Sequence, residues 1–437
     1  MTRLLSLVLV ATAATAPLAG QARAPDTSSR FQTQADDYTR YELLAPGSAK
    51  FRILYEVTAT TSGATHFFNP IRKGSIASDE RVVDRMTGEP LVFDVAGGEL
   101  ARAGGVRNAD TTTQYIRVRL ARPVTKDGEA RVLIDKTYYD PKSYYEEGGL
   151  LVFARPLGIR RNAIVLPAGY EVVSCNVPSQ VIEEADGRIA ISFWNTLPAE
   201  APLIIKARPG RGRRSAERGG ADVGRDVTTV RTVVPVSPPT RPPSPAAPPA
   251  TLSERAHQDR EIVYFLRDPD THAFDLYHDY TETREGMDRY LNVVRPGSTA
   301  SNPSARLLDT GEALKPEILK GEAITAAKLD LGEPVRPDSE VVLIRFPPVA
   351  RGASVRLRIS ETYTDPARYK VENGELVWDR SFGRPRNAVV LPAGWMLTAS
   401  SIPATVSETD DGRIRLDFAN PRPDEIAVLI KAKRRSR

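Results

Sequence analysis

The chain of 437 residues contains very little cysteine, histidine or methionine, with one Cys, four His and four Met. Its single cysteine, Cys175, excludes an intramolecular disulfide and any zinc or iron–sulfur site built from several cysteines. No His-Glu-x-x-His pattern, Gly-x-Ser-x-Gly elbow, Walker loop or Gly-x-Gly-x-x-Gly cradle occurs, so the signatures of gluzincin peptidases, common serine hydrolases and nucleotide-binding proteins are missing. We therefore expect no metal, no cofactor, no catalytic residue and no enzymatic activity.

Long apolar runs are also missing beyond the first residues. Residues 1–24 combine Arg3, an apolar stretch from Leu4 to Ala16 and small residues ending at Ala24, which is the pattern of a secretory signal peptide. An uncleaved anchor or a buried helix is the alternative, but a membrane span needs about 20 apolar residues. We expect a secreted protein, periplasmic or extracellular, with no transmembrane segment in its mature chain.

A basic face on the folded part is not expected, although the formal net charge is +5. The basic excess lies in residues 208–260, which hold ten Arg and five acidic residues, and in the last residues from Lys431 to Arg437. Nucleic-acid binding would need a basic patch on a folded surface, so we expect no nucleic-acid partner. These two segments either make weak contact with an anionic surface or simply carry solvated charge.

The chain contains a tandem repeat. A shift of 225 places residues 131–208 on 356–433 without a gap, and 35 of these 78 positions are identical. Upstream the match continues at a shift of 223, which makes each unit about 165–175 residues long and large enough to bury its own core. We predict repeat 1 over 38–208 and repeat 2 over 259–433, each folding separately.

Between the repeats lies a predicted linker, residues 209–258. Its first part is rich in Gly and Arg, and residues 235–249 hold eight prolines. Such a stretch is typical of a semi-rigid spacer, with a ligand for a Pro-recognising domain as the alternative. Residues 434–437 are predicted to form a basic tail.

Short alternating runs indicate strands in both repeats. Ile116, Val118 and Leu120 alternate with polar or aromatic residues, a period of two that is typical of a half-buried strand. Asp186-Gly187 and Asp411-Gly412 lie between such runs and predict hairpins whose two turn residues both take positive φ. With helical patterns nearly absent, we predict an all-β protein of two homologous antiparallel β-sandwich domains in tandem.

Polar and aromatic residues kept in both repeats are the candidate binding residues. Tyr and Arg together suit a recognition surface. The alternative is structural, because Asp-Pro favours turns and an Arg paired with Asp can hold a loop. The candidates are Tyr138, Asp140, Tyr144, Arg155, Arg161 and Asn162 in repeat 1, and Tyr363, Asp365, Tyr369, Arg380, Arg386 and Asn387 in repeat 2.

Both units resemble a family of uncharacterised secreted bacterial proteins. In pattern they also resemble the amino-terminal β-domain of aminopeptidase N-like gluzincins, through the run 116–120 followed by Pro123, the segment 132–138, the stretch 167–170 and the Asp186-Gly187 hairpin. The resemblance covers about 130 residues of each unit and implies a β-sandwich that supports other domains. The catalytic helix with its metal ligands is missing, so the resemblance implies a non-catalytic role.

Taken together, these features predict a non-enzymatic binding or structural module that recognises an envelope protein or a polysaccharide. Two tethered copies would raise avidity by increasing the effective concentration of the second site. A hydrolase with an unfamiliar site, or an accessory or assembly factor for another envelope protein, is the alternative.

Overall fold

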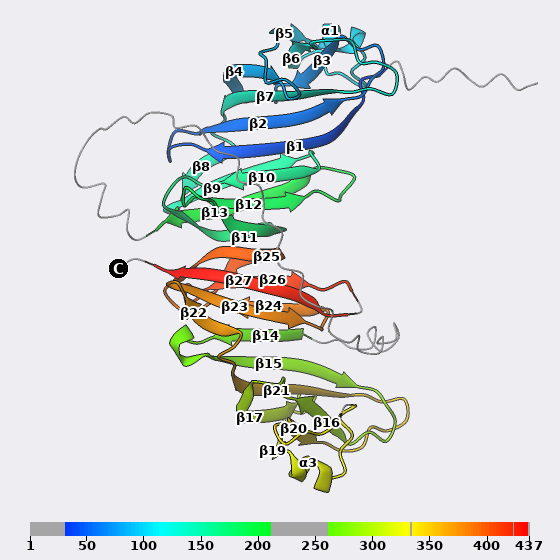
Figure 1. Ribbon diagram of the computed structural model, residues 1–437, viewed down its shortest axis with the longest axis vertical. Coiled ribbons are helices and arrows are strands. Elements are labelled where there is room, and N and C mark those ends of the chain that lie inside the picture. Colours follow the sequence, from blue (N-terminus) through cyan, green and yellow to red (C-terminus); the bar gives the residue numbers. More distant parts are fainter. Residues whose placement is uncertain (1–30, 211–260, 333, 423, 436–437) are drawn as a thin grey trace, which may run out of the picture. The chain divides into compact units, whose positions relative to one another are not determined.

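The computed structural model describes residues 31–210 and 261–435, except 333 and 423 (Figure 1). The predicted signal peptide, residues 211–258 of the linker and the last two residues of the tail lie outside this part. Within it, the regular structure is almost entirely strand, with two short α-helices and one 3-10 turn. The prediction of an all-β protein is confirmed.

Repeat 1 contains thirteen described strands and one short helix. They are β1 (Gln34–Leu43), β2 (Lys50–Ala59), β3 (His66–Pro70), β4 (Ile76–Asp84), β5 (Phe93–Gly97), α1 (Gly98–Ala103), β6 (Gln114–Arg119), β7 (Ala130–Tyr139), β8 (Tyr144–Glu147), β9 (Leu150–Leu157), β10 (Arg161–Val165), β11 (Tyr170–Glu183), β12 (Ile189–Trp194) and β13 (Ala201–Pro209). Following the pairings, the large sheet runs β8-β9-β13-β11-β12-β10-β1-β2-β7-β4, and β3-β6-β5 form a small sheet.

Repeat 2 contains the same plan. Its elements are β14 (Glu261–Leu266), η3 (Pro269–Thr271), β15 (Ala273–Glu282), β16 (Arg289–Val293), β17 (Thr299–Leu307), β18 (Ala313–Leu314), β19 (Pro316–Lys320), α3 (Glu322–Ala326), β20 (Glu340–Arg345), β21 (Val355–Thr364), β22 (Tyr369–Glu372), β23 (Glu375–Phe382), β24 (Arg386–Val390), β25 (Trp395–Glu408), β26 (Ile414–Ala419) and β27 (Ile426–Arg434). The large sheet runs β22-β23-β27-β25-β26-β24-β14-β15-β21-β17-β18, and β16-β20-β19 form the small sheet.

The sheets are not purely antiparallel. In each repeat one pair of strands is parallel, β1 with β10 and β14 with β24. Parallel neighbours need a long connection rather than a hairpin, and in both repeats most of the domain lies between the two paired strands. Local alternation predicts the strands themselves but carries no information on this long-range pairing.

The Asp-Gly turns also differ from the prediction in detail. Only the glycines take positive φ, +78° at Gly187 and +79° at Gly412. Gly187 N–H donates to the carbonyl of Glu184 at 2.9 Å, and the Asp186 carboxylate accepts from the backbone N–H of Arg188 at 3.0 Å. Because the Asp side chain accepts a backbone N–H across the turn, the turn forms with only its glycine in the left-handed region.

Two compact units divide the chain, and their boundary does not follow the repeat. The first unit combines residues 31–35, Ala59–Ile71 and Leu91–Ala130, and therefore contains the β3-β6-β5 sheet and α1. A cluster of Phe68, Ala96, Ala101, Ala109 and Tyr115 is its core. The second unit contains the large sheet of repeat 1 and all of repeat 2, because β11 pairs with β25. That each repeat folds separately stays a prediction.

Interlocking aromatic rings form much of the core of the second unit. In repeat 1, Phe51 meets Phe153 edge to face, with ring centroids 5.4 Å apart. In repeat 2, Tyr264 contacts Trp378 at 5.3 Å and Phe382 at 6.0 Å. Burying one such side chain stabilises the fold by about 1.5–3 kcal/mol.

Candidate functional site

The structure buries ten of the twelve candidate binding residues. Only Arg161, which is half-buried, and Arg386, which is exposed, reach the surface. The buried residues are Tyr138, Asp140, Tyr144, Arg155, Asn162, Tyr363, Asp365, Tyr369, Arg380 and Asn387. A buried side chain can contact no ligand in this conformation.

Asp140 is the centre of a network in repeat 1. Its Oδ1 accepts backbone N–H groups of Lys142 at 3.2 Å and Ser143 at 3.1 Å, which closes the turn after β7. Its Oδ2 accepts from the hydroxyls of Ser75 and Ser143 and from Arg155 Nη1 at 2.8 Å. Burial alone would raise the pKa of Asp140, but these hydrogen bonds and the Arg155 charge lower it overall.

The Arg–Asp pair and the Tyr hydroxyl contact recur in repeat 2, whereas the hydroxyl of Ser298, the counterpart of Ser75, has no hydrogen-bond partner among the described residues. Arg380 Nη1 donates to Asp365 Oδ2 at 2.5 Å, and both side chains are buried. The Tyr369 hydroxyl donates to the carbonyl of Arg267, as the Tyr144 hydroxyl donates to that of Leu44. The Tyr144 hydroxyl thus links the start of β8 to the residue after β1. The Tyr369 hydroxyl links the start of β22 to the residue after β14 in the same way. The geometry therefore favours the structural alternative for the buried candidates.

One buried position carries opposite charges in the two repeats, and sequence reasoning missed it. Lys136 and Glu361 are equivalent, and each is about 3% exposed. Asn292 Nδ2 donates to Glu361 Oε2 at 2.7 Å, while Oε1 has no hydrogen-bond partner among the described residues. Burial raises the pKa of Glu361 to about 7 and lowers that of Lys136 to about 7. The sequence signal for these two residues is that a position of the repeat alignment expected in the core carries opposite charges in the two repeats.

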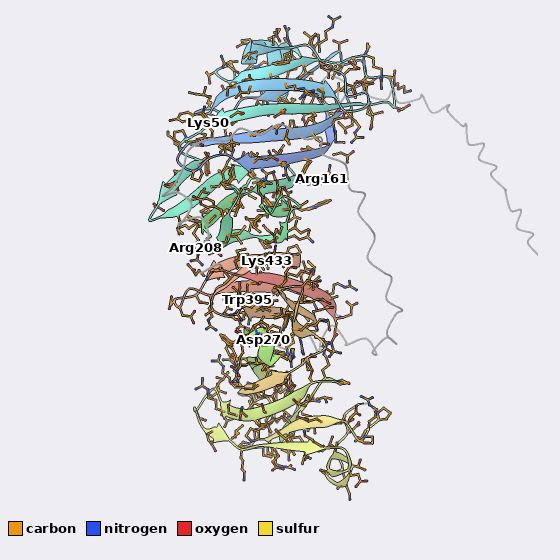
Figure 2. All side chains as sticks on the ribbon, turned by 60° about the vertical axis from the view of Figure 1, so that its left-hand side comes forward. Lys50, Arg161, Arg208, Asp270, Trp395 and Lys433 are labelled. Atoms are coloured by element: carbon orange, nitrogen blue, oxygen red, sulfur yellow. The ribbon has the colours of Figure 1, made fainter. Side chains whose placement is uncertain are left out.

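A row of aromatic and arginine side chains crosses the outer face of repeat 1, with Trp194 exposed and Tyr38 and Arg161 half-buried. Tyr38 on β1 pairs with Arg161 on β10, and Arg161 pairs with Trp194 on β12. Paired residues on adjacent strands point to the same face, so these three side chains form one row. Trp194 is 67% exposed, and the Arg161 guanidinium, labelled in Figure 2, donates to the carbonyl of Asp36 at 2.5 Å.

Repeat 2 lacks this row. The equivalent registers place Glu261 beside Arg386, and Arg386 beside Ala419. The aromatic row therefore belongs to repeat 1 alone, and it includes only one of the twelve candidates, Arg161. Trp194 stands where repeat 2 has Ala419, and this difference is the sequence signal for the row. A comparison that looks only for residues shared by the repeats does not find it.

A groove of about 580 Å³, here named the seam groove, lies where β11 meets β25. Lys433 Nζ contacts Glu183 Oε2 at 2.5 Å, and Gln180 Nε2 donates to the carbonyl of Ser401 at 2.6 Å. Thr398 Oγ1 is buried with no hydrogen-bond partner among the described residues. The lining residues are Gln180, Val181, Ile182, Glu183, Glu184, Ala185, Gly187, Glu375, Thr398, Ala399, Ser400, Ser401, Leu429, Lys431 and Lys433.

The row and the seam groove lie on the same face of the sheet. Gln180, which lines the groove, pairs with Ser192 on β12. Trp194 follows two residues later on β12, so it points to the same face as Ser192. Ile182 is two residues from Gln180 on β11 and is 57% exposed. The face therefore offers two large exposed apolar side chains, Trp194 and Ile182, and a groove of mixed polar and apolar lining that includes Ile182.

Neither a metal-holding cluster nor a membrane-spanning helix is found in the part of the chain that the structure describes. Within residues 31–210 and 261–435, no three His, Cys, Asp or Glu side chains are placed to hold a metal ion. The helices of that part are too short and too polar to cross a bilayer. Cys175 is buried and hydrogen-bonds the carbonyl of Val177, and burial raises the pKa of its thiol.

Comparison with known proteins shows a partial likeness to one group of structures. An M1 zinc metallopeptidase from Deinococcus radiodurans is 14% identical, with a TM-score of 0.27, over 41% of this chain and 43% of the peptidase. An aminopeptidase N family protein from Idiomarina loihiensis is 11% identical, with a TM-score of 0.26, over 40% of this chain and 29% of that protein. The chain thus spans less than half of the structures it matches.

No protein-family model matches the chain, and no curated protein matches it. The matched structures are aminopeptidase N-like, as the sequence resemblance implies, but the low identity and partial coverage establish no catalytic activity. The chain therefore bears a faint resemblance to M1 aminopeptidase structures over about 41% of its length.

Proposed function

We propose that this protein is a secreted, non-enzymatic binding module whose outer face on repeat 1 recognises a protein of the cell envelope. The observation that carries the proposal is the exposure of Trp194 in a row with Arg161 and Tyr38. Trp, Tyr and Arg are the side chains most enriched at the energetic centres of protein interfaces, and Trp and Tyr bury a large apolar area there.

The chemistry of the seam groove favours a protein partner over a polysaccharide. Its lining combines carboxylates, ammonium groups and backbone with the apolar side chains of Ile182 and Leu429, and it contains no aromatic ring among the described residues. Such a surface can pair with the mixed side chains of an extended polypeptide beside the Trp194 anchor. A sugar chain, which would stack on aromatic rings, would find them only in the row.

Replacing Trp194 with Ala is expected to weaken partner binding about tenfold or more, because a large anchor is lost from the face. The partner is captured from an envelope extract with the mature protein and identified. It is then purified, and its dissociation constant is measured by titration calorimetry. Ile76→Ala is the matched control, since Ile76 is 64% exposed but lies on β4.

Equal affinity of the Trp194→Ala variant, or a loss of the same size in Ile76→Ala, would contradict this site. Retention of a polysaccharide and no protein would assign the face to the other class of partner. Turnover of an extract component by the mature protein would favour the hydrolase alternative.

A further inference from the structure

The β11–β25 pairing is symmetric in its register. A contact between two antiparallel strands is isologous when both strands contribute the same stretch of their sequence to it. The register pairs Cys175 with Val406, Ser179 with Ala404 and Val181 with Ser400. In the repeat alignment Cys175 corresponds to Ser400, Ser179 to Ala404 and Val181 to Val406. Each repeat therefore presents the same edge to the other, as in a homodimer about a two-fold axis.

Reciprocal ion pairs repeat this symmetry. Glu183 of repeat 1 contacts Lys433 of repeat 2 at 2.5 Å, and Arg208 of repeat 1 contacts Glu408 of repeat 2. Glu183 is equivalent to Glu408, and Arg208 to Lys433, so the two contacts are the same interaction made twice. Both basic residues are labelled in Figure 2. The complementary charges persist in both halves although more than half of the aligned positions differ.

One ion pair in the seam is not symmetric. Glu171 Oε2 accepts from Arg435 Nε at 2.9 Å, and both side chains are largely buried. In the alignment Glu171 corresponds to Met396, and Arg435 to Gly210. Two copies of repeat 1 would leave Glu171 with only Arg208 of its own repeat, and two copies of repeat 2 would place Arg435 opposite Met396. A buried charge left without its partner is strongly unfavourable, so this pair distinguishes mixed from like pairing.

We propose that the seam is a self-complementary docking surface whose occupant is the other half of the same chain, and that Glu171 with Arg435 selects this mixed pair. The symmetric contacts supply affinity between any two halves. The asymmetric ion pair supplies specificity. The connection between the halves raises their effective concentration and keeps the mixed pair within one chain.

The test uses the full chain with a protease site inserted within residues 211–260. After cleavage, native mass spectrometry and size exclusion are expected to show the halves together as a one-to-one complex. Separation of the cleaved halves at micromolar concentration would overturn the proposal. A complex containing two copies of the same half in the unmodified seam would overturn the selective role of Glu171 and Arg435.

Charge variants of the cleaved protein test the contacts one by one. Glu171→Met, which installs the repeat 2 residue, is expected to weaken the mixed pair about 30-fold and to allow like pairs to form. Lys433→Glu is expected to weaken it about tenfold or more, and the added change Glu183→Lys is expected to restore it. Arg422→Glu is the control, because Arg422 is 61% exposed and pairs with Asp424 inside its own repeat.

Failure of the reversed pair to restore association would contradict the reciprocal arrangement. Because both partners of the Lys433 contact are partly exposed, the Lys433 and Glu183 variants leave the core of each half intact. Association is read from the mass of the complex rather than from partner binding, so this test is independent of the proposed function.

Discussion

Asp365→Ala is expected to lower the free energy of unfolding by about 3–5 kcal/mol, because it leaves the Arg380 guanidinium buried without its counter-charge. Asp365 is fully buried, and Arg380 Nη1 lies 2.5 Å from its carboxylate. The pair closes the turn after β21, where the Asp365 carboxylate also accepts the backbone N–H of Arg368. The measurement is urea unfolding at neutral pH, followed by tryptophan fluorescence, to which the buried Trp378 contributes.

An exposed ion pair supplies the control. Asp424→Ala removes the partner of Arg422, whose side chain is mostly exposed, and should change stability by about 1 kcal/mol or less. Asp140→Ala should behave like Asp365→Ala, because Asp140 makes the equivalent contact with Arg155. If Asp140→Ala and Asp365→Ala each lower the free energy of unfolding by less than about 1 kcal/mol, the structural role is contradicted and both residues are again candidates for binding.

Glu361→Gln is expected to stabilise the protein by about 3 kcal/mol above pH 7 and to have little effect below pH 4.5. Burial raises the pKa of Glu361 from 4.5 to about 7. Between these values the native state holds a proton that the unfolded state has lost, so stability falls as the pH rises through this window. Above pH 7 the full cost of a buried carboxylate is present, and the neutral amide avoids it.

Lys136→Met is expected to show the opposite dependence of stability on pH. Burial lowers the pKa of Lys136 from 10.5 to about 7, so between these values the unfolded state binds the extra proton. Stability therefore rises with pH across this window, and the Met variant should gain most at pH 7 or below and nothing above pH 10.5. Unfolding free energies from urea titrations at several pH values measure both variants. Gains that do not change with pH would show that neither group titrates as described.

Local sequence signals were sufficient for most of the strands. The alternation at 116–120 predicts the strand β6, and the repeat transfers each strand of one half to the other. The parallel partners β10 and β24 could not be predicted, because residues far apart in the chain form these pairs. The compact units differ from the repeats for the same reason, since the contact of β11 with β25 is long-range.

The candidate site was harder to predict than the fold. Identity between the repeats singled out Asp140, Arg155 and Tyr144, which hold turns and strand corners inside the protein. Positions kept in both halves record the shared fold, whereas Trp194 and Glu171 differ from their counterparts Ala419 and Met396. Trp194, Glu171 and Arg435 thus lie where the repeats diverge, whereas Arg161 and Glu183 of the proposed surfaces are kept in both repeats.

The amino-acid pattern alone established an all-β protein with an internal duplication, because side-chain alternation and turn residues act over a few positions. The tertiary structure decided which faces are covered, which charges are buried and which edges pair. Those outcomes depend on contacts between distant strands, where burial changes a residue such as Asp365 from a surface candidate into part of the core. A side chain's chemistry can be read from its identity, but its solvent exposure is set only when the sheets assemble.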